Sequence, residues 1–315
     1  MKIHNELTYI NNSSLALGYF DGLHLGHKVV LKNAINIAKQ NNTQSTVIIF
    51  RTHPLSVISD KKIEQILTLN EKLEILNKIG IDNVILLNFE DYASVKAQFY
   101  LENILVKYFS PIAITTGFNH SFGFNKEGNS SFLKKYQNKY GYKYFEIPPF
   151  TYDGSIVSCS VIRNLIASGD FYEADKLLGY NFFVRGNVVT GDKIASKLGF
   201  ASANIVYPKD KIQIPFGVYF VKVKYDNEIY TGVLNHGYAP TLNNEVHIKT
   251  EVHIIEFNKN IYGKEIEISF IAKIRNQQKF ENIEKLKSQI IRDIAFTQIY
   301  EKFLNGHFSM TRNKF

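Results

Sequence analysis

The hydrophobic pattern of this chain changes its period near residue 180, and that change constrains the fold more than any other feature. Before it, short apolar runs alternate with stretches of helical periodicity, which is the βαβ rhythm of a parallel sheet with helices on both faces. After it, apolar and polar residues alternate singly between turn residues, which is typical of antiparallel strands. The 315 residues are also about twice the length of a typical domain. We therefore predict domains at 1–180 and 181–305, followed by a tail at 306–315.

In the first half, five apolar runs indicate strands and three segments between them indicate helices. The strands are expected at Ser14–Phe20, Ser45–Phe50, Asn83–Phe89, Pro111–Gly117 and Tyr142–Ile147. A first helix should begin near Gly26, and a third should cover about Ser94–Tyr108. The second should start at a T-x-x-E capping box formed by Thr68 and Glu71, and it should end at Gly80.

The second half opens with two short helices and continues as a predicted antiparallel barrel. The helices are expected at Val161–Ala167 and Phe171–Leu178. The strands of the barrel are expected at Val218–Val223, Ile229–Leu234, Thr250–Glu256 and Ile266–Ile271. An amphipathic helix at about Ile283–Leu304 should follow the barrel.

Composition narrows the class of protein. The sequence contains no long apolar segment and no secretory signal, so we expect a cytoplasmic protein without a membrane partner. The single cysteine, Cys159, excludes an internal disulfide and cannot build a zinc site by itself. The net charge of +8 suits substrates with several phosphates. Nucleic acid is not expected, because the lysines are spread along the chain without an arginine-rich block.

The segment Gly18–His27 lies where the first strand ends and the first helix begins, which is the phosphate-binding position of an open α/β sheet. Unpaired N–H groups at the helix start attract phosphate, and Gly22 and Gly26 let the backbone approach it closely. His24 and His27 are three residues apart and can face the same pocket. Nucleotidyl transfer needs such donors more than it needs a nucleophile. The alternative is two solvated histidines beside a structural Asp21.

This segment carries a resemblance to a known family. H-x-G-H after a first strand resembles the nucleotidylyltransferase superfamily, and the longer G-x-F-D-G-x-H-x-G-H resembles the FAD synthetase branch of the bacterial bifunctional riboflavin kinase/FAD synthetases. The resemblance implies an α/β nucleotidylyltransferase domain with a Rossmann-like parallel sheet, in which His24 and His27 are catalytic. The residues that it places around the nucleotide are Gly18, Phe20, Asp21, Gly22 and Gly26. Another acceptor, as in cytidylyl or pantetheine-phosphate transferases, is the alternative that the F-D-G extension disfavours.

Three further segments resemble the same branch. Arg51–Pro54 is similar to F-x-P-H-P, with Thr52 in place of the first proline. Gly117–Gly123 resembles the flavin-binding loop G-x-D-F-x-F-G, which implies flavin contacts for Asn119 and Phe122, although Asn119 and His120 stand where the family has Asp and Phe. The segment 158–163 resembles S-S-T-x-I-R, which implies that Ser158, Ser160 and Arg163 meet the leaving pyrophosphate. Cys159 replaces a serine of this motif, and we interpret it as a passive substitution.

From about Gly179 to residue 305 the chain resembles a riboflavin kinase domain, a small antiparallel β-barrel with a C-terminal helix. Gly186–Asp192 matches its first glycine loop, which implies that Gly186 and Gly191 lie near the nucleotide phosphates. Leu198–Asn204 is similar to L-G-F-P-T-A-N, and Tyr262–Lys264 matches Y-G-K.

Phosphoryl transfer to riboflavin needs a divalent ion on the phosphates and a group that accepts the hydroxyl proton. By position, the resemblance gives Mg²⁺ coordination to Ser202 and Asn204, and the role of base to Glu251. Alternation along the strand alone instead favours Glu251 as a solvent-facing charge. The positions that depart from the family and weaken the expected phosphate and flavin contacts are Ala195, Ser196, Ala201 and Ala239.

The sequence thus predicts a flavin-cofactor enzyme that takes riboflavin, FMN and ATP and yields FMN and FAD, with Mg²⁺ as the ion. One alternative is an FAD synthetase whose kinase domain is weak or silent. An alternative of another class is a flavin- or RNA-binding regulator without activity, which the intact His24, His27 and Arg163 argue against.

Overall fold

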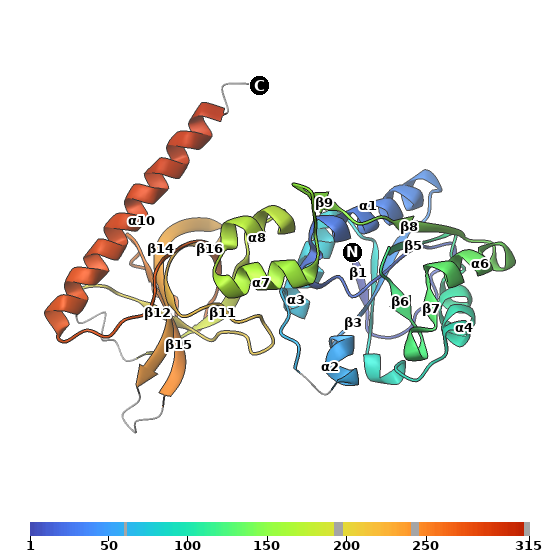
Figure 1. Ribbon diagram of the computed structural model, residues 1–315, viewed down its shortest axis with the longest axis horizontal. Helices are drawn as coiled ribbons and strands as arrows, with labels where there is room; N and C mark the ends of the chain where they lie inside the picture. The colour runs from blue at the N-terminus through green and yellow to red at the C-terminus, as the bar shows by residue number, and fades with distance from the viewer. Residues whose placement is uncertain (60–61, 192–197, 241–245, 312–315) are drawn as a thin grey trace. The chain divides into compact units, whose positions relative to one another are not determined.

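The computed structural model describes residues 1–59, 62–191, 198–240 and 246–311. The chain divides into two compact units (Figure 1). Unit 1 contains Met1–Ile162 and Leu177–Gly179, and unit 2 contains Arg163–Lys176 and Tyr180–Phe315. Ala195 and Ser196 lie outside the described residues.

Unit 1 is built on a parallel sheet with the strand order β1-β4-β3-β2-β5-β8. The strands are β1 (Lys2–His4), β2 (Ser14–Leu17), β3 (Ser45–Phe50), β4 (Asn83–Leu87), β5 (Ala113–Gly117) and β8 (Lys143–Ile147). The five strands expected from the sequence are therefore present. The edge strand β1 was missed because its three residues are mostly exposed and carry no apolar pattern. The first predicted strand ends early, at Leu17, because Phe20 has a left-handed backbone (φ 53°) that begins the next loop.

Helices cover the sheet of unit 1. The principal helices are α1 (Leu25–Gln40), α2 (Pro54–Ile58), α3 (Leu69–Ile79) and α6 (Ser130–Tyr140). The predicted helix near residues 94–108 is present as three consecutive segments: α4 (Ala97–Phe99), the π-helical η3 (Tyr100–Val106) and α5 (Lys107–Phe109). The capping box of Thr68 and Glu71 and the left-handed Gly80 (φ 95°) start and end α3 as expected. Sequence reasoning missed α6, although Phe132, Tyr136 and Tyr140 recur at helical spacing beside the buried Leu133 and pack against the core.

Short elements complete unit 1. Its 3₁₀ turns are η1 (Asp21–Leu23), η2 (Phe89–Asp91) and η4 (Phe124–Lys126). Its two-residue strands are β6 (Ser121–Phe122), β7 (Gly128–Asn129), β9 (Thr151–Tyr152) and β10 (Ser155–Ile156). The core on one face of the sheet joins residues of β2 and β5 to the helical segment after residue 97, for example Leu15, Ile114 and Leu101.

Unit 2 is a closed antiparallel barrel with the strand order β11-β12-β15-β14-β13-β16. Its strands are β11 (Phe183–Val189), β12 (Ala203–Ile205), β13 (Gly217–Tyr225), β14 (Glu228–Pro240), β15 (Val246–Ile254) and β16 (Glu265–Arg275). The predicted barrel is confirmed, although β11 and β12 were not recognised as strands. β12 has only three residues, and Gly186 interrupts the apolar run of β11.

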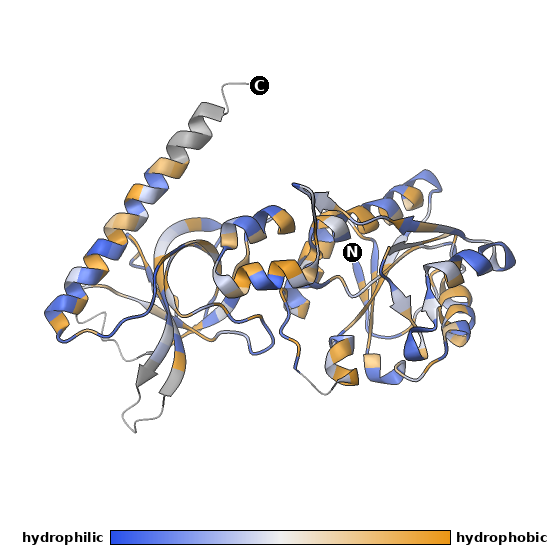
Figure 2. Ribbon diagram, viewed as in Figure 1, coloured by the Kyte–Doolittle hydropathy of each residue, from blue (hydrophilic) through white to orange (hydrophobic). Residues whose placement is uncertain are grey.

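Helices accompany the barrel in the part of unit 2 that the structure describes. They are α7 (Cys159–Ser168), which begins in unit 1, α8 (Phe171–Leu178) and α10 (Ile283–Thr311). The last helix continues to Thr311, beyond its expected end near residue 304. Figure 2 shows hydrophobic and hydrophilic residues interspersed along α10. Asp293 and Thr297 are buried, whereas Ile283 and Ile299 are exposed, so apolar character does not mark the buried side of this helix as the amphipathic prediction required. In the described part of the chain, no helix combines the length and apolar character needed to cross a bilayer.

Candidate functional site

The loop between β2 and α1 is held in a fixed shape by backbone geometry and by one buried carboxylate. Gly22 has φ 73°, a conformation that glycine adopts without steric cost. Asp21 is 3% exposed, and its Oδ1 accepts hydrogen bonds from the backbone N–H of Ile66 (3.0 Å) and Leu67 (3.5 Å). Asp21 therefore anchors the loop to the segment that precedes α3.

The two histidines of this loop lie against each other at the start of α1. His24 is the N-cap residue, and its Nδ1 accepts a hydrogen bond from the backbone N–H of His27 (3.3 Å). The two imidazole rings stack with 3.6 Å between their centroids and an interplanar angle of 17°. The ring of Phe20 packs edge-on against His27 at 5.4 Å. The predicted convergence of His24 and His27 is thus present in the structure.

Burial determines the charge of this histidine pair. Desolvation lowers the pKa of His24 to about 4, and it lowers the pKa of His27 well below its ordinary value, with the charges of His24 and Lys72 adding to the effect. Both rings are therefore neutral near pH 7 and can each donate one N–H. Positive charge comes instead from Lys72, which sequence reasoning missed. Its Nζ is 3.8 Å from the centre of the Tyr19 ring and donates to the Tyr19 carbonyl oxygen (3.1 Å), although the side chain is only 1% exposed.

Unit 1 also contains an aromatic cavity of about 290 Å³ beside the Gly18 end of the loop. The predicted flavin loop supplies His120 and Phe122 to its wall, and Phe122 contacts the ring of Tyr100 at 5.6 Å. Asn119 is exposed and does not line the cavity. The lining residues that sequence reasoning missed include Phe50, Phe89, Tyr92 and Tyr100. They stand on separate elements, so no local motif marked them.

The segment resembling S-S-T-x-I-R forms the start of α7. Ser158 Oγ accepts from the backbone N–H of Val161 (3.4 Å), which caps the helix, and Ser160 is exposed. The thiol of Cys159 donates to the carbonyl oxygen of Asp21 at 3.0 Å. Arg163 is half-buried in the second turn of α7 and falls in unit 2.

In the barrel, β12 and β15 place the predicted kinase residues side by side. Asn204 is the register partner of Glu251, and Ser202 Oγ donates a hydrogen bond to Glu251 Oε1. Lys249 Nζ lies 3.2 Å from Glu251 Oε2. The side chain of Glu251 is 17% exposed, so it is not the solvent-facing charge that strand alternation alone favoured.

Ser202 stands between two cavities. One, of about 240 Å³, is lined by Ala201, Val252, Tyr262 and neighbouring residues. The other, of about 280 Å³, contains Glu251, Lys249 and Asn235 together with residues of β16 and α10. Since Ser202 lines both, a group bound in one cavity can meet a group bound in the other at this hydroxyl.

The two predicted phosphate-loop glycines have different surroundings. A Cβ on Gly191 would lie 1.9 Å from Nδ2 of Asn204, so only glycine lets this amide take its place. Gly186 belongs to β11, where it pairs with Ile266 and a Cβ would lie 2.6 Å from the Val206 carbonyl oxygen. The expectation that Gly186 lies in a loop is therefore wrong, because close strand contact requires it there.

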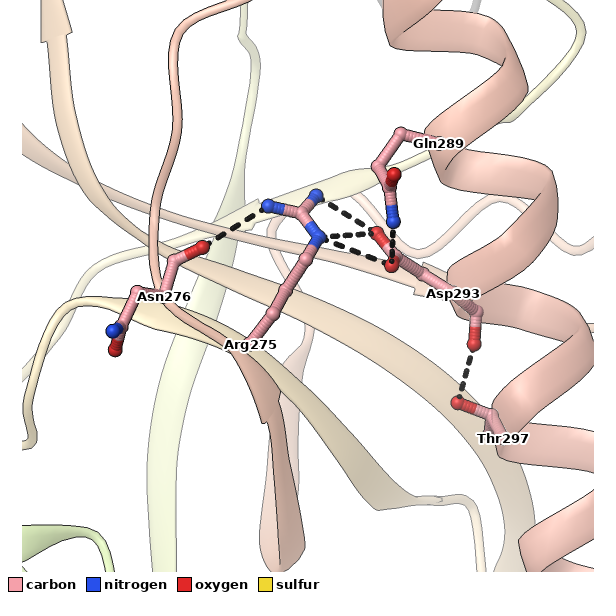
Figure 3. Close-up of polar contacts among 5 residues, drawn as sticks. All are labelled: Arg275, Asn276, Gln289, Asp293 and Thr297. Carbon is pink, nitrogen blue, oxygen red and sulfur yellow. Dashed lines mark hydrogen bonds and ion pairs between the residues drawn. The ribbon is translucent and has the colours of Figure 1, made fainter.

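An ion pair that sequence reasoning missed ties α10 to the wall of the larger barrel cavity (Figure 3). Arg275 Nε and Nη2 donate to the carboxylate of Asp293 at 2.8–3.1 Å, and Asp293 is 3% exposed. Gln289 Nε2 also donates to this carboxylate (2.9 Å), and the hydroxyl of Thr297 donates to the Asp293 carbonyl oxygen (3.0 Å). The partners are 18 residues apart in sequence, so only the fold brings them together.

Comparison with known proteins finds two family models that match successive parts of the chain. Residues 7–161 match the family model for FAD synthetase, and residues 178–300 match the model for riboflavin kinase. A bifunctional riboflavin kinase/FMN adenylyltransferase of Buchnera aphidicola is 35% identical over 308 residues, covering 96% of this chain and 97% of the relative. The protein of that name from Listeria monocytogenes is 33% identical, with 92% of each chain covered.

Among solved structures, a protein of Streptococcus pneumoniae that is described as a macrolide-efflux protein has the same fold. It superposes with a TM-score of 0.83 at 27% identity, covering 94% of this chain and 98% of the other. The two family models together span almost the whole sequence, and the named relatives match it nearly from end to end. The chain therefore belongs to the family of bifunctional riboflavin kinase/FMN adenylyltransferases.

Proposed function

We propose that this chain catalyses two consecutive reactions, in which riboflavin and ATP give FMN and ADP, and FMN and ATP then give FAD and pyrophosphate. The observation that carries the proposal is that each unit sets its own group of buried or half-buried polar residues beside its own cavity. His24 and His27 stand at the start of α1 near the aromatic cavity, and Ser202 and Glu251 stand where the two barrel cavities meet. ATP as co-substrate and a single cysteine both suit the cytoplasm, the compartment that the sequence predicts.

For adenylyl transfer, the FMN phosphate already carries the attacking oxygen as an anion, so the site needs no base. The neutral His24 and His27 can donate N–H groups to the ATP phosphates, and the N-terminus of α1 adds its partial positive charge. Lys72, buried behind Tyr19, contributes a full charge nearby. The aromatic cavity offers a place for the flavin ring system, with Phe122 and Tyr100 in its wall.

For riboflavin phosphorylation, Glu251 is suited to accept the proton of the reacting hydroxyl. Ser202 and Lys249 hold its two carboxylate oxygens and so fix its direction. The residues also fit a magnesium ion, because Asn204 Oδ1 is buried without a hydrogen-bond partner among the described residues and the Ser202 hydroxyl belongs to the same segment. An ion held there would neutralise charge on the ATP phosphates.

The alternative of an FAD synthetase with a weak kinase is favoured by Ala201, which stands where the family has proline. The carbonyl oxygen of Ala201 accepts a hydrogen bond from Nδ1 of the half-buried His253 (2.7 Å), which partly replaces the lost stiffness. Ser202 retains the hydroxyl. We therefore propose a kinase that is active, but slower than one with the full motif.

One assay separates these functions. The purified chain is incubated with riboflavin, ATP and Mg²⁺, and FMN and FAD are separated by chromatography. His24→Ala should lower conversion of FMN to FAD by roughly 10²–10³, the scale for loss of one transition-state donor, while phosphorylation of riboflavin persists. Glu251→Gln should show the reverse pattern. Asn36→Ala, on the exposed side of α1, is the matched control.

Each outcome bears on a different part of the proposal. Full FAD synthesis by a His24→Ala/His27→Ala double variant would refute the assignment of the adenylyl site. Wild-type protein that converts supplied FMN to FAD, yet makes no FMN at any riboflavin or Mg²⁺ concentration, would establish the FAD synthetase alternative.

A further inference from the structure

The adenylyl site contains a group of metal-ligand atoms that joins the two histidines of the proposed reaction to a cysteine that the reaction does not use. His24, His27 and Cys159 each offer one nitrogen or sulfur atom, and these atoms all lie within 4.8 Å of one another. Within the described residues this is the only group of three or more His, Cys, Asp or Glu side chains placed to hold a metal ion. The cysteine comes from the start of α7 and the histidines from the start of α1, so the fold, and not a local motif, assembles the group.

The three ligand atoms are near enough to one another for a three-ligand tetrahedral site that forms by side-chain rotation. Zinc–nitrogen bonds of about 2.0–2.1 Å and zinc–sulfur bonds of about 2.3 Å put tetrahedral donor atoms roughly 3.3–3.6 Å apart. The ligand atoms of His24, His27 and Cys159 lie within 4.8 Å of one another, and the two imidazole rings are stacked with an interplanar angle of 17°, so their lone pairs do not yet point at one ion. Completing the site therefore requires an imidazole ring to rotate and the donor atoms to draw closer together.

The chemistry of the three donors selects the kind of ion. Two imidazole nitrogens and one thiolate favour Zn²⁺ and similar borderline-soft ions, whereas Mg²⁺ prefers oxygen ligands. With three protein ligands, the fourth position stays open to water or to a phosphate oxygen. His27 Nδ1 is also buried without a hydrogen-bond partner among the described residues, as expected for a nitrogen that a metal can use.

Several contacts oppose binding and set its strength. A metal bound to His24 breaks the 3.3 Å hydrogen bond that Nδ1 accepts from the backbone N–H of His27. A metal on Nδ1 takes the lone pair itself, and a metal on Nε2 leaves the ring proton on Nδ1, which then cannot accept. The thiol of Cys159 must release its proton and its 3.0 Å contact with the Asp21 carbonyl oxygen. The charge of Lys72 acts on His27 and repels a cation. Binding is consequently weaker than at a structural zinc site and is reversible.

We propose that His24, His27 and Cys159 form a reversible binding site for Zn²⁺-class cations, and that the bound ion inhibits FAD synthesis by withdrawing both histidines from ATP. The inhibition rests on the proposed function, whereas the binding does not. Riboflavin phosphorylation uses residues of the barrel and should be insensitive to the same ion.

Binding is tested with Co²⁺ as a spectroscopic probe and Zn²⁺ as competitor, in the presence of excess Mg²⁺. Since Cys159 is the single cysteine of the chain, a thiolate-to-Co²⁺ absorption band can arise from this residue alone. The wild-type protein should show the band, and Zn²⁺ should abolish it. Cys159→Ser should lack the band and bind Zn²⁺ at least about 100-fold more weakly, since even outer-shell changes at metal sites cost 10–100-fold in affinity. Absence of the band in the wild-type protein would overturn the site, as would equal Zn²⁺ affinity of the two proteins.

Inhibition is measured on the same two proteins. Zn²⁺ should suppress FMN-to-FAD conversion by the wild-type chain while riboflavin phosphorylation continues, and a chelator should restore FAD synthesis. Cys159→Ser should still make FAD and require at least tenfold more Zn²⁺ for the same suppression. Equal suppression in both proteins would overturn the inhibitory role. If metal-free wild-type protein made no FAD, the proposed function would fail. The Co²⁺ band would still show whether His24, His27 and Cys159 bind a metal ion.

Discussion

The burial of His120 should make the stability of unit 1 depend on pH by an amount that can be measured. It stands where the resembling family has phenylalanine, and its ring packs against Phe122 at 5.8 Å in the wall of the aromatic cavity. Its Nε2 atom is buried without a hydrogen-bond partner among the described residues. Desolvation lowers the pKa of His120 from 6.5 to about 4. The substitution His120→Phe should therefore remove an acid-sensitive contribution to the stability of unit 1.

The magnitude follows from linkage between protonation and folding. Because the pKa of His120 is lower in the folded chain, its neutral form favours folding above about pH 6.5, and this contribution is lost as the pH falls toward about 4. Between pH 7 and pH 5 the unfolded chain takes up about 0.7 of a proton at this position, and the folded chain takes up about 0.1. At about 1.36 kcal/mol per pKa unit, the wild-type protein should lose roughly 2 kcal/mol more than His120→Phe over this interval.

The assay is urea unfolding at pH 7 and pH 5, followed by limited proteolysis with mass-spectrometric detection of peptides from residues 1–162. His120→Asn is the second variant, because it keeps a polar side chain but does not titrate. His24 and His27 retain their own pH dependence in all three proteins, so the difference between proteins isolates His120. If the free energy of unfolding falls equally in all three between the two pH values, burial does not hold His120 neutral.

Three further predictions concern the barrel. Phe171→Ala should destabilise unit 2 by about 3–5 kcal/mol, because the Phe171 side chain is 1% exposed and packs among aromatic rings. Tyr172 on the same helix is 68% exposed, so Tyr172→Ala should cost under about 1 kcal/mol. Equal destabilisation by the two substitutions in urea unfolding of the barrel would contradict this packing. Arg275→Met should lower the free energy of unfolding, measured by thermal unfolding, by about 3–5 kcal/mol, because it leaves the Asp293 carboxylate buried without a neutralising charge. Adding Asp293→Leu should recover much of that loss. A double variant no more stable than Arg275→Met would contradict this prediction. Ala201→Pro should raise riboflavin phosphorylation several-fold, because a stiffer backbone before Ser202 loses less conformational freedom when substrate binds, and an unchanged rate would show that this departure is silent.

Much of the fold was determined by local sequence signals. Continuous apolar runs bounded by turn residues placed five strands of the parallel sheet, because a strand buried on both faces must be apolar throughout. The capping box of Thr68 and Glu71 and the left-handed Gly80 fixed the ends of α3 by backbone hydrogen bonding within a few residues. The motif Gly18–His27 placed both histidines at one helix start, since three residues of helix bring side chains to the same side.

Other features were decided only when distant segments met. The lining of the aromatic cavity, the buried charge of Lys72 and the pair of Arg275 and Asp293 depend on elements that no sequence spacing connects. The charge state of His24 also depends on distant elements. A histidine can be neutral or charged near neutral pH, and desolvation by the surrounding fold favours the neutral form here. In the sequence Cys159 was a conservative replacement for serine, and tertiary structure placed its sulfur beside two imidazoles because α7 and α1 begin at the same place.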